Sequence, residues 1–299
     1  MGFTSGAKVL GDIIDEIADS LIASSVNWVE GDSTWDTDDR TTGNDNARRC
    51  LKYTGDTEDI WLTLEAINSN SRKVHDTYYA KGLRVSFSSG WDSVNNTWSG
   101  TPFQSFVAFE SEYNDTTPNS NLETLQVNYF LWTDSSGFVI MGVPEPIEAD
   151  NRQSSFIAVV EHMGTKEYSD GLTNFYFYQE LNYRASSTAD SGGFEIFYVL
   201  RPFSYEDYND GVQFWSDPKF ALKSNGNGKV YFMKPIVCNT SDEKTPIYQS
   251  ELFFKVSTGA GLVDGDVIAI DGETTKYLVK MISSPDSGTT INYAMKYVA

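Results

Sequence analysis

The alternation of apolar and polar residues constrains the fold of this chain more than any other feature. In residues 59–68, Ile60, Leu62 and Leu64 alternate with polar or amphipathic residues. A period of two places successive side chains on opposite faces of a strand, so the pattern predicts strands with one apolar face. Similar runs lie at 82–91, 102–112, 124–134, 137–143, 171–183, 194–205, 265–282 and 289–298, between segments rich in Gly, Ser, Asn and Asp. We therefore expect a mainly β fold of sandwich-like or barrel-like domains.

Residues 8–23 depart from this pattern, because their apolar residues recur at helical spacing. Ile13, Ile14, Ile17 and Leu21 form one stripe, and acidic residues take the opposite face. The spacing predicts one N-terminal amphipathic helix, with Ser5 as its candidate N-cap. The stripe has two interpretations: it covers one side of a sheet in the same chain, or it packs on a neighbouring subunit. On the second interpretation, its four residues belong to a subunit interface.

Turn signals divide the remaining chain. A Ser-Ser-Gly sequence between the runs at 124–134 and 137–143 predicts a hairpin. Two prolines and several polar residues interrupt the strands at 143–155, and a second polar interruption lies at 238–246. These interruptions predict three domains: a helix plus a β domain in 1–147, a second β domain in 148–240, and a small C-terminal β domain in 241–299.

The charge of the chain excludes some partners. It has 42 acidic and 22 basic residues, which gives a formal net charge of −20. Phosphate backbones and anionic lipid surfaces repel such a chain, so we expect no specific nucleic-acid partner and no membrane partner. No apolar run is long enough to span a bilayer, and no signal peptide is recognisable. The two cysteines, Cys50 and Cys238, are expected to be free thiols.

Residues 32–50 form an unusually acidic segment, DSTWDTDDRTTGNDNARRC. A calcium loop that starts at Asp36 fails, because Arg40 and Thr41 take positions that need an oxygen ligand and a glycine. Asp and Asn also favour turns, so we expect a turn-dense polar loop that a neighbouring subunit orders. An irregular calcium site stays open as a minor alternative. The candidate interface residues in this loop are Trp35, Asp36, Asp38, Asp39 and Arg40.

The chain offers few groups for catalysis. His75 and His162 are its two histidines, and the sequence holds no GxSxG, HExxH, P-loop or GxGxxG motif. Two arginines precede Cys50 and favour a thiolate there, but a small cysteine buried on a strand is the commoner case. We therefore expect no enzymatic activity and no cofactor. A hydrolase acting on the cell envelope is a weaker alternative, which needs a histidine with partners or two carboxylates within about 10 Å of each other.

Two tryptophans in the polar segment GWDSVNNTWSG favour a carbohydrate site. Exposed indole rings stack on sugars, and neighbouring carboxylates and amides bond to sugar hydroxyl groups. The candidate sugar-binding residues are Trp91, Asp92, Asn95, Asn96 and Trp98. The alternative is that both rings close the open end of a β-sandwich core.

Parts of the chain resemble virion structural proteins of large tailed bacteriophages. The N-terminal similarity is carried by SGAKVLGDIIDEIADSLIASSVNW, the loop STWDTDDRTTGN and the strand run GLRVSFSSGWDS. The C-terminal run GLVDGDVIAIDGETTKYLV resembles the small β-domains of phage neck and tail-completion proteins. These similarities cover the first third and the last sixth of the chain.

The resemblance implies a non-enzymatic structural component of a tailed-phage virion, assembled in the host cytoplasm. It implies a neck or tail position and assembly as a homo-oligomeric ring. The partners would be copies of the chain and other virion proteins. The alternative function is a peripheral tail or baseplate module that binds host carbohydrate.

Overall fold

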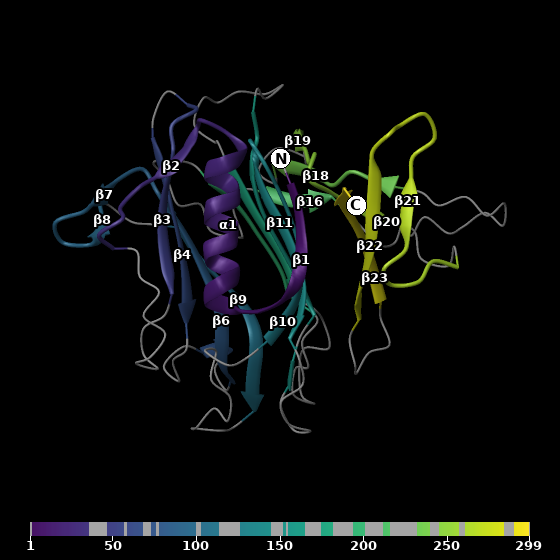
Figure 1. Cartoon of the computed structure of the whole chain (residues 1–299), viewed down its shortest axis with the longest axis horizontal. Helices are drawn as coiled ribbons and strands as arrows, with labels where there is room; N and C mark the ends of the chain where they lie inside the picture. The colour runs from purple at the N-terminus through teal and green to yellow at the C-terminus, as the bar shows by residue number, and fades with distance from the viewer. Residues whose placement is uncertain are drawn as a thin grey trace.

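The chain was analysed as a computed structural model, which describes most of the sequence (Figure 1). The described residues are 2–35, 47–56, 59–67, 73–75, 78–99, 103–113, 126–144, 152–153, 155–164, 175–181, 194–200, 212–215, 232–239, 245–256, 261–283 and 290–298. The expected fold class is confirmed: the fold is mainly β, with one N-terminal helix and antiparallel sheets that include a curled half-barrel.

Two large antiparallel sheets form the body of the molecule. The first, here called the central sheet, has the order β1 (Gly2–Val9), β10 (Gln126–Asp134), β11 (Gly137–Pro144), β13 (Phe156–His162), β14 (Phe175–Leu181) and β15 (Phe194–Leu200). The second, the outer sheet, has the order β12 (Arg152–Gln153), β9 (Phe103–Tyr113), β6 (Tyr78–Ser88), β4 (Ile60–Ile67), β3 (Arg48–Tyr53) and β2 (Trp28–Glu30), and β5 (Lys73–His75) also pairs with β6.

Three smaller sheets complete the described fold. The C-terminal sheet has the order β17 (Phe232–Met233), β20 (Phe253–Val256), β23 (Thr290–Tyr297), β22 (Lys276–Ser283) and β21 (Val267–Ala269). A three-stranded sheet contains β16 (Val212–Trp215), β18 (Ile236–Asn239) and β19 (Thr245–Gln249). A two-stranded hairpin contains β7 (Trp91–Asp92) and β8 (Thr97–Trp98) and projects from one end of the long axis (Figure 1).

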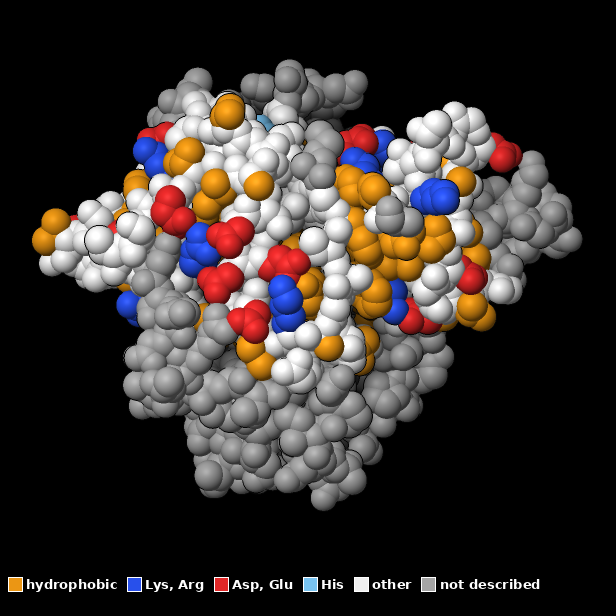
Figure 2. Space-filling model, in the orientation of Figure 1, with side chains coloured by type: hydrophobic (Ala, Val, Ile, Leu, Met, Phe, Trp, Pro, Cys, Tyr) orange, Lys and Arg blue, Asp and Glu red, His pale blue; other side chains and the backbone are white. Residues whose placement is uncertain are grey.

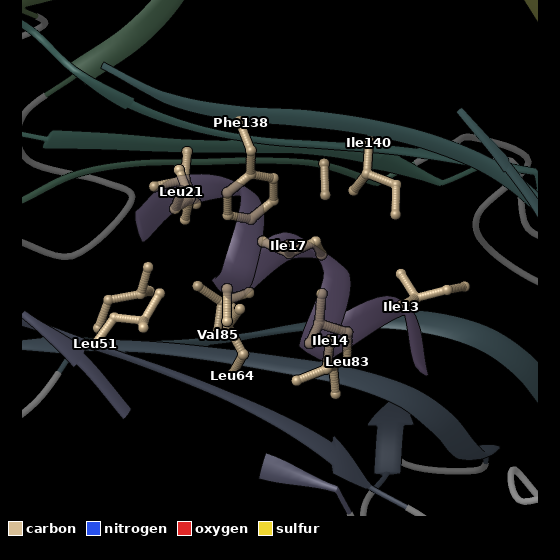
Figure 3. Packing of buried hydrophobic residues seen from close by; sticks show 14 of the residues in the cluster. Ile13, Ile14, Ile17, Leu21, Leu51, Leu64, Leu83, Val85, Phe138 and Ile140 are labelled. Atoms are coloured by element: carbon tan, nitrogen blue, oxygen red, sulfur yellow. The ribbon is translucent and has the colours of Figure 1, made fainter. Parts of the chain in front are cut away.

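Helix α1 (Leu10–Ser24) lies between the central and outer sheets. Figure 3 shows Ile17 between Phe138 of the central sheet and Val85 of the outer sheet. The four stripe residues Ile13, Ile14, Ile17 and Leu21 have no exposed surface. They therefore have no surface left for a neighbouring subunit, and the structure corrects that part of the expectation. When the apolar face of the helix packs between two sheets, all of the apolar surface of the stripe is removed from water.

The start of the helix also differs from the expectation. Ser5 lies in β1, which runs to Val9, and no side chain caps the first turn at Val9. The backbone pairing of β1 with β10 extends from Gly2 to Val9. Residues 2–9 therefore add an edge strand to the central sheet, and the helix begins at Leu10.

Ion pairs attach the polar side of the helix to both sheets. On the outer-sheet side, Arg49 of β3 lies between three carboxylates: its nitrogens are 3.4 Å from Asp15, 3.0 Å from Asp19 and 2.9 Å from Glu30. On the central-sheet side, Lys8 lies 2.7 Å from Glu16. These contacts lie on the face of the helix opposite its apolar stripe and are consistent with burial of that stripe.

The predicted hairpin at 124–143 is confirmed as β10 and β11, and residues 154–163, whose pattern fits strand or helix, contain strand β13. The central sheet joins β10 and β11 to β13 and β14 by hydrogen bonds. The expected domain boundary at residue 147 therefore runs through one sheet. Polar and proline residues interrupt a strand, but they do not prevent the chain from returning to the same sheet.

The strands β10, β11 and β13 of the central sheet are buried on both faces over most of their length. One face packs with the helix and the outer sheet, and its other face packs with the C-terminal sheet. Alternate residues of β13 divide between these cores: Phe156 and Ala158 belong to the first, and Ile157 and Val159 belong to the second. The C-terminal sheet carries a further apolar cluster on its far side. The described fold is thus layered, with the central sheet in the middle.

Candidate functional site

Two surfaces and one side-chain pair are candidates for function. The first surface is a hairpin of residues 91–98, here called the tryptophan arm. Trp91 and Trp98 face each other across its two strands, with their rings edge to face at 4.8 Å. Trp35 packs on Trp91 at 5.1 Å. The structure therefore brings together tryptophans from two segments that sequence analysis considered separately.

Asp32 anchors the arm to the body. Its side chain is buried and accepts a hydrogen bond of 2.7 Å from the Trp91 indole nitrogen. The Thr34 backbone nitrogen and hydroxyl group donate to its other oxygen at 3.0 and 2.6 Å. Burial acts to raise the pKa of Asp32, but the hydrogen bonds from Thr34 and Trp91 outweigh burial and lower it. The carboxylate is thus ionised and held in place.

The base of the arm is closed by Trp35, which is 7% exposed. The Arg48 guanidinium lies 4.8 Å from the centre of its ring, and Arg48 Nε donates to its carbonyl oxygen at 2.6 Å. Trp35 therefore packs within the chain and offers little surface to a neighbouring subunit. The other expected interface residues of this loop, Asp36, Asp38, Asp39 and Arg40, lie outside the described residues.

The polar residues of the arm mainly bond to one another. Asp92 accepts hydrogen bonds from the backbone nitrogens of Val94 and Asn95 at 2.9 and 3.2 Å, and from the Asn95 amide at 2.6 Å. These bonds lower the pKa of Asp92. Asn96 has a φ of 51°, which fits its position in the turn. Asp92 and Asn95 thus build the turn, and this use competes with the sugar hydrogen bonds expected of them.

The tip of the arm is exposed and carries one apolar residue among polar ones. Val94 is 87% exposed. In Figures 1 and 2 the arm extends away from the body and carries hydrophobic atoms at its end. Single exposed apolar residues are common on protein surfaces, so Val94 is informative only together with the partly exposed Trp91 and Trp98 of the same arm.

The second surface, here called the seam patch, lies where β1 meets β23. Figure 2 shows hydrophobic side chains gathered over this junction. Half-buried Phe3 and Tyr297 pack edge to face at 4.8 Å, and the Lys280 amine lies 4.3 Å from the ring of half-buried Phe130. Aromatic rings beside a lysine are common in protein interfaces, although sequence analysis did not single out these residues.

His162 forms a pair that sequence analysis missed. Its Nε2 atom lies 2.8 Å from an Asp56 oxygen, and its Nδ1 accepts a hydrogen bond of 3.1 Å from the Gly164 backbone nitrogen. Acceptance at Nδ1 places the proton of the neutral ring on Nε2, where it is donated to Asp56. The ring also packs on Tyr53 and Phe175. Both nitrogens thus bond within the chain, so this arrangement leaves neither one to activate a nucleophile.

The described residues offer no clear metal site or membrane span. No group of three His, Cys, Asp or Glu side chains among them could hold a metal ion. In the same part of the chain, no helix combines the length and apolar character needed to cross a membrane. Cys50 is a buried thiol on β3.

Comparisons of the chain with protein-family models, curated proteins and solved structures found no match. The two surfaces and the phage resemblance of the sequence are therefore the basis for a functional proposal.

Proposed function

We propose that this protein is a non-enzymatic structural component of a tailed-phage virion, at the neck or tail, which assembles as a homo-oligomeric ring. The observation that carries the proposal is the pair of separate apolar surfaces, the tryptophan arm and the seam patch. A ring needs two different surfaces that fit each other, because each subunit uses one surface toward each neighbour.

The shapes of the two surfaces favour such a contact. The arm is a narrow projection that ends in Val94, and its conformation is held by Asp32 and the paired tryptophans. The seam patch is a broader aromatic area around Phe3 and Tyr297. A preorganised arm loses little conformational entropy when it binds. We propose that the arm of one subunit packs on the seam patch of the next.

Asp92 on the arm and Lys280 at the seam patch carry opposite charges, but the Lys280 side chain is only 12% exposed. Asp92 lies on the exposed arm, and Lys280 lies over Phe130 at the seam patch. Lys280 also pairs with Asp264, so its charge is already partly compensated within the chain. Opposite charges at the rim of an apolar contact contribute more to orientation than to affinity.

The test is the native mass of the purified protein, measured for the wild type and for Val94→Asp. The wild type should have the mass of a closed ring, and Val94→Asp should shift it to monomer, because the substitution places a charge in an apolar contact. Val26→Asp is the matched control, since Val26 is also exposed, at 91%, but lies between α1 and β2, away from the arm and the seam patch. A monomeric wild type, or equal disruption by both variants, would overturn the arm contact.

The position on a particle requires a separate experiment. Antibodies against the purified protein should label the neck or tail of intact phage particles in electron micrographs. Labelling of infected cells but not of purified particles would exclude a virion component.

Carbohydrate binding is the second candidate, and the partial exposure of Trp91 and Trp98 favours it. A glycan array probed with the wild type and with Trp98→Ala tests it. Binding that Trp98→Ala abolishes would place a sugar-binding tail module ahead of the ring component.

A further inference from the structure

Glu161 is a fully buried carboxylic acid at the contact between the central and C-terminal sheets. It follows Ile157 and Val159 along the face of β13 that packs toward the C-terminal sheet. The alternation of β13 predicts an apolar residue at position 161, but the residue there is a glutamate. A charge at such a position is costly unless hydrogen bonds compensate for the loss of water.

Four neutral donors surround the Glu161 carboxylate. The Tyr248 hydroxyl and the Glu251 backbone nitrogen donate to Oε1 at 2.9 and 2.8 Å. The Ser250 hydroxyl lies 2.8 Å from Oε2, and the Tyr176 hydroxyl also bonds to Oε2. We call these groups the Glu161 clasp.

The clasp connects two parts of the fold. Glu161 and Tyr176 are directly opposed on β13 and β14 of the central sheet. Ser250 and the Glu251 nitrogen belong to the segment that leads from β19 into β20 of the C-terminal sheet. Hydrogen bonds of the clasp therefore cross the junction between the two sheets, next to the apolar contacts of Leu252 and Phe253.

Two acids and two lysines lie around the clasp. Asp134 and the Glu251 carboxylate act on Tyr248. Lys296 lies 3.8 Å from Asp134, and Lys234 lies 2.6 Å from Glu251, so each acid has a basic partner. Burial raises the pKa of Tyr176 and of Tyr248, which keeps both hydroxyls protonated. Burial also raises the pKa of Glu161 to about 7, although its four hydrogen bonds act to lower it.

We propose that the Glu161 clasp is a pH-sensitive device that loosens the C-terminal sheet from the central sheet as the pH rises through neutrality. Below neutrality the acid is uncharged, and its proton is shared with the Ser250 or Tyr176 oxygen. Above neutrality the junction buries a negative charge among neutral donors. Separation of the sheets lets water hydrate that charge, so the open form gains population. This inference stands whether or not the protein is a virion component.

The test is hydrogen exchange of the full chain at pH 6 and pH 8.5, corrected for the intrinsic exchange rate. The C-terminal sheet strands β20, β22 and β23 should lose protection by roughly tenfold between these values in the wild type, the change that follows from a folded pKa near 7. Strands β3 and β4 of the outer sheet should change much less. Glu161→Gln keeps the shape of the side chain without a charge, and its amide nitrogen can donate to the Ser250 and Tyr176 hydroxyl oxygens once these hydroxyls rotate. In this variant the loss of protection between pH 6 and pH 8.5 should disappear.

Glu16→Gln is the matched control. Glu16 also bonds to a tyrosine, Tyr129, but it lies between the helix and β10, and its pKa is lowered. This variant should keep the wild-type loss of protection in the C-terminal sheet. The proposal is overturned if that sheet keeps its protection at pH 8.5 in the wild type, or if Glu161→Gln loses protection as the wild type does.

Ser250→Ala covers the case in which Glu161→Gln does not fold. It removes one donor to the ionised carboxylate, which disfavours the ionised form in the closed state. The loss of protection of the C-terminal sheet between pH 6 and pH 8.5 should therefore be larger than in the wild type. An unchanged or smaller loss would also overturn the proposal.

Discussion

Asp32 shows how one side chain determines the position of a surface. Its two oxygens divide between Thr34, in its own turn, and the indole of Trp91, on the arm. The local bonds form the turn after β2, and the remote bond attaches a hairpin that begins 59 positions later in the chain. A buried carboxylate whose oxygens both accept hydrogen bonds has a fixed orientation. Its bond to Trp91 therefore restricts the position of the arm.

Replacement of Asp32 by alanine tests this role. Asp32→Ala leaves the Trp91 indole nitrogen and the Thr34 donors without their partner, which should lower the free energy of unfolding by about 1–3 kcal/mol. Urea unfolding measures the change. Asp271→Ala, at an exposed aspartate in the turn before β22, should change stability by less than about 0.5 kcal/mol. Equal effects of both substitutions would remove Asp32 from the anchor role.

At the scale of elements, the packing of the two large sheets against each other depends on α1. The sheets do not close on each other on this side; the helix fills the space between them with an apolar stripe. Its polar face is held by ion pairs that are mostly exposed, such as those of Arg49 with Asp19 and Glu30. Exposed pairs contribute about 0–1 kcal/mol each, so the stripe and not the charges provides most of the attachment.

Truncation of the stripe tests this division. Ile17→Ala should lower the free energy of unfolding by about 2–5 kcal/mol, because it leaves a cavity between the two sheets. Val26→Ala, just beyond the helix and 91% exposed, should have almost no effect. Chemical denaturation measures both variants. A loss below about 1 kcal/mol for Ile17→Ala would mean that the sheets hold together without the helix.

At the scale of the whole molecule, two carboxylates, the half-buried Glu16 and the buried Glu161, make stability depend on pH in opposite ways. The pKa of Glu16 is lowered in the fold, so its contribution is present above its unfolded value and is lost as the pH falls. The pKa of Glu161 is raised from 4.5 to about 7, so its contribution is present below the unfolded value and is lost as the pH rises toward 7. The free energy of unfolding should therefore decrease both at low pH, through Glu16, and toward neutral pH, through Glu161.

The Glu161 part can be isolated by comparison with Glu161→Gln. Between about pH 4.5 and pH 7.5 the wild type should lose about 3 kcal/mol of unfolding free energy relative to the variant. Urea unfolding at several pH values measures this difference. Parallel curves for the two proteins would show that Glu161 has the same pKa in the folded and unfolded chain.

Alternation and helical spacing were sufficient to predict the long strands such as β4, β6 and β10 and most of the helix, because these patterns record which side of an element is buried. They did not predict β1, which takes the residues expected before the helix. They also identified Trp91 and Trp98, since tryptophan in a polar segment is conspicuous. They could not identify Glu161, Asp56 with His162, or the seam patch. Each of these depends on residues that are distant in sequence, and Glu161 in particular is one acid among 42 acidic residues.

The sequence by itself determined the class of fold and the inward face of the helix and of the alternating strands, because both follow from short-range periodicity and the hydrophobic effect. Only the tertiary structure decided what each apolar face meets. The helix stripe meets two sheets of its own chain, the segments on either side of residue 147 share one sheet, and Asp32 joins the arm to the body. These outcomes rest on pairing between distant segments, where many partners have similar local preference and the packing of the whole chain selects one.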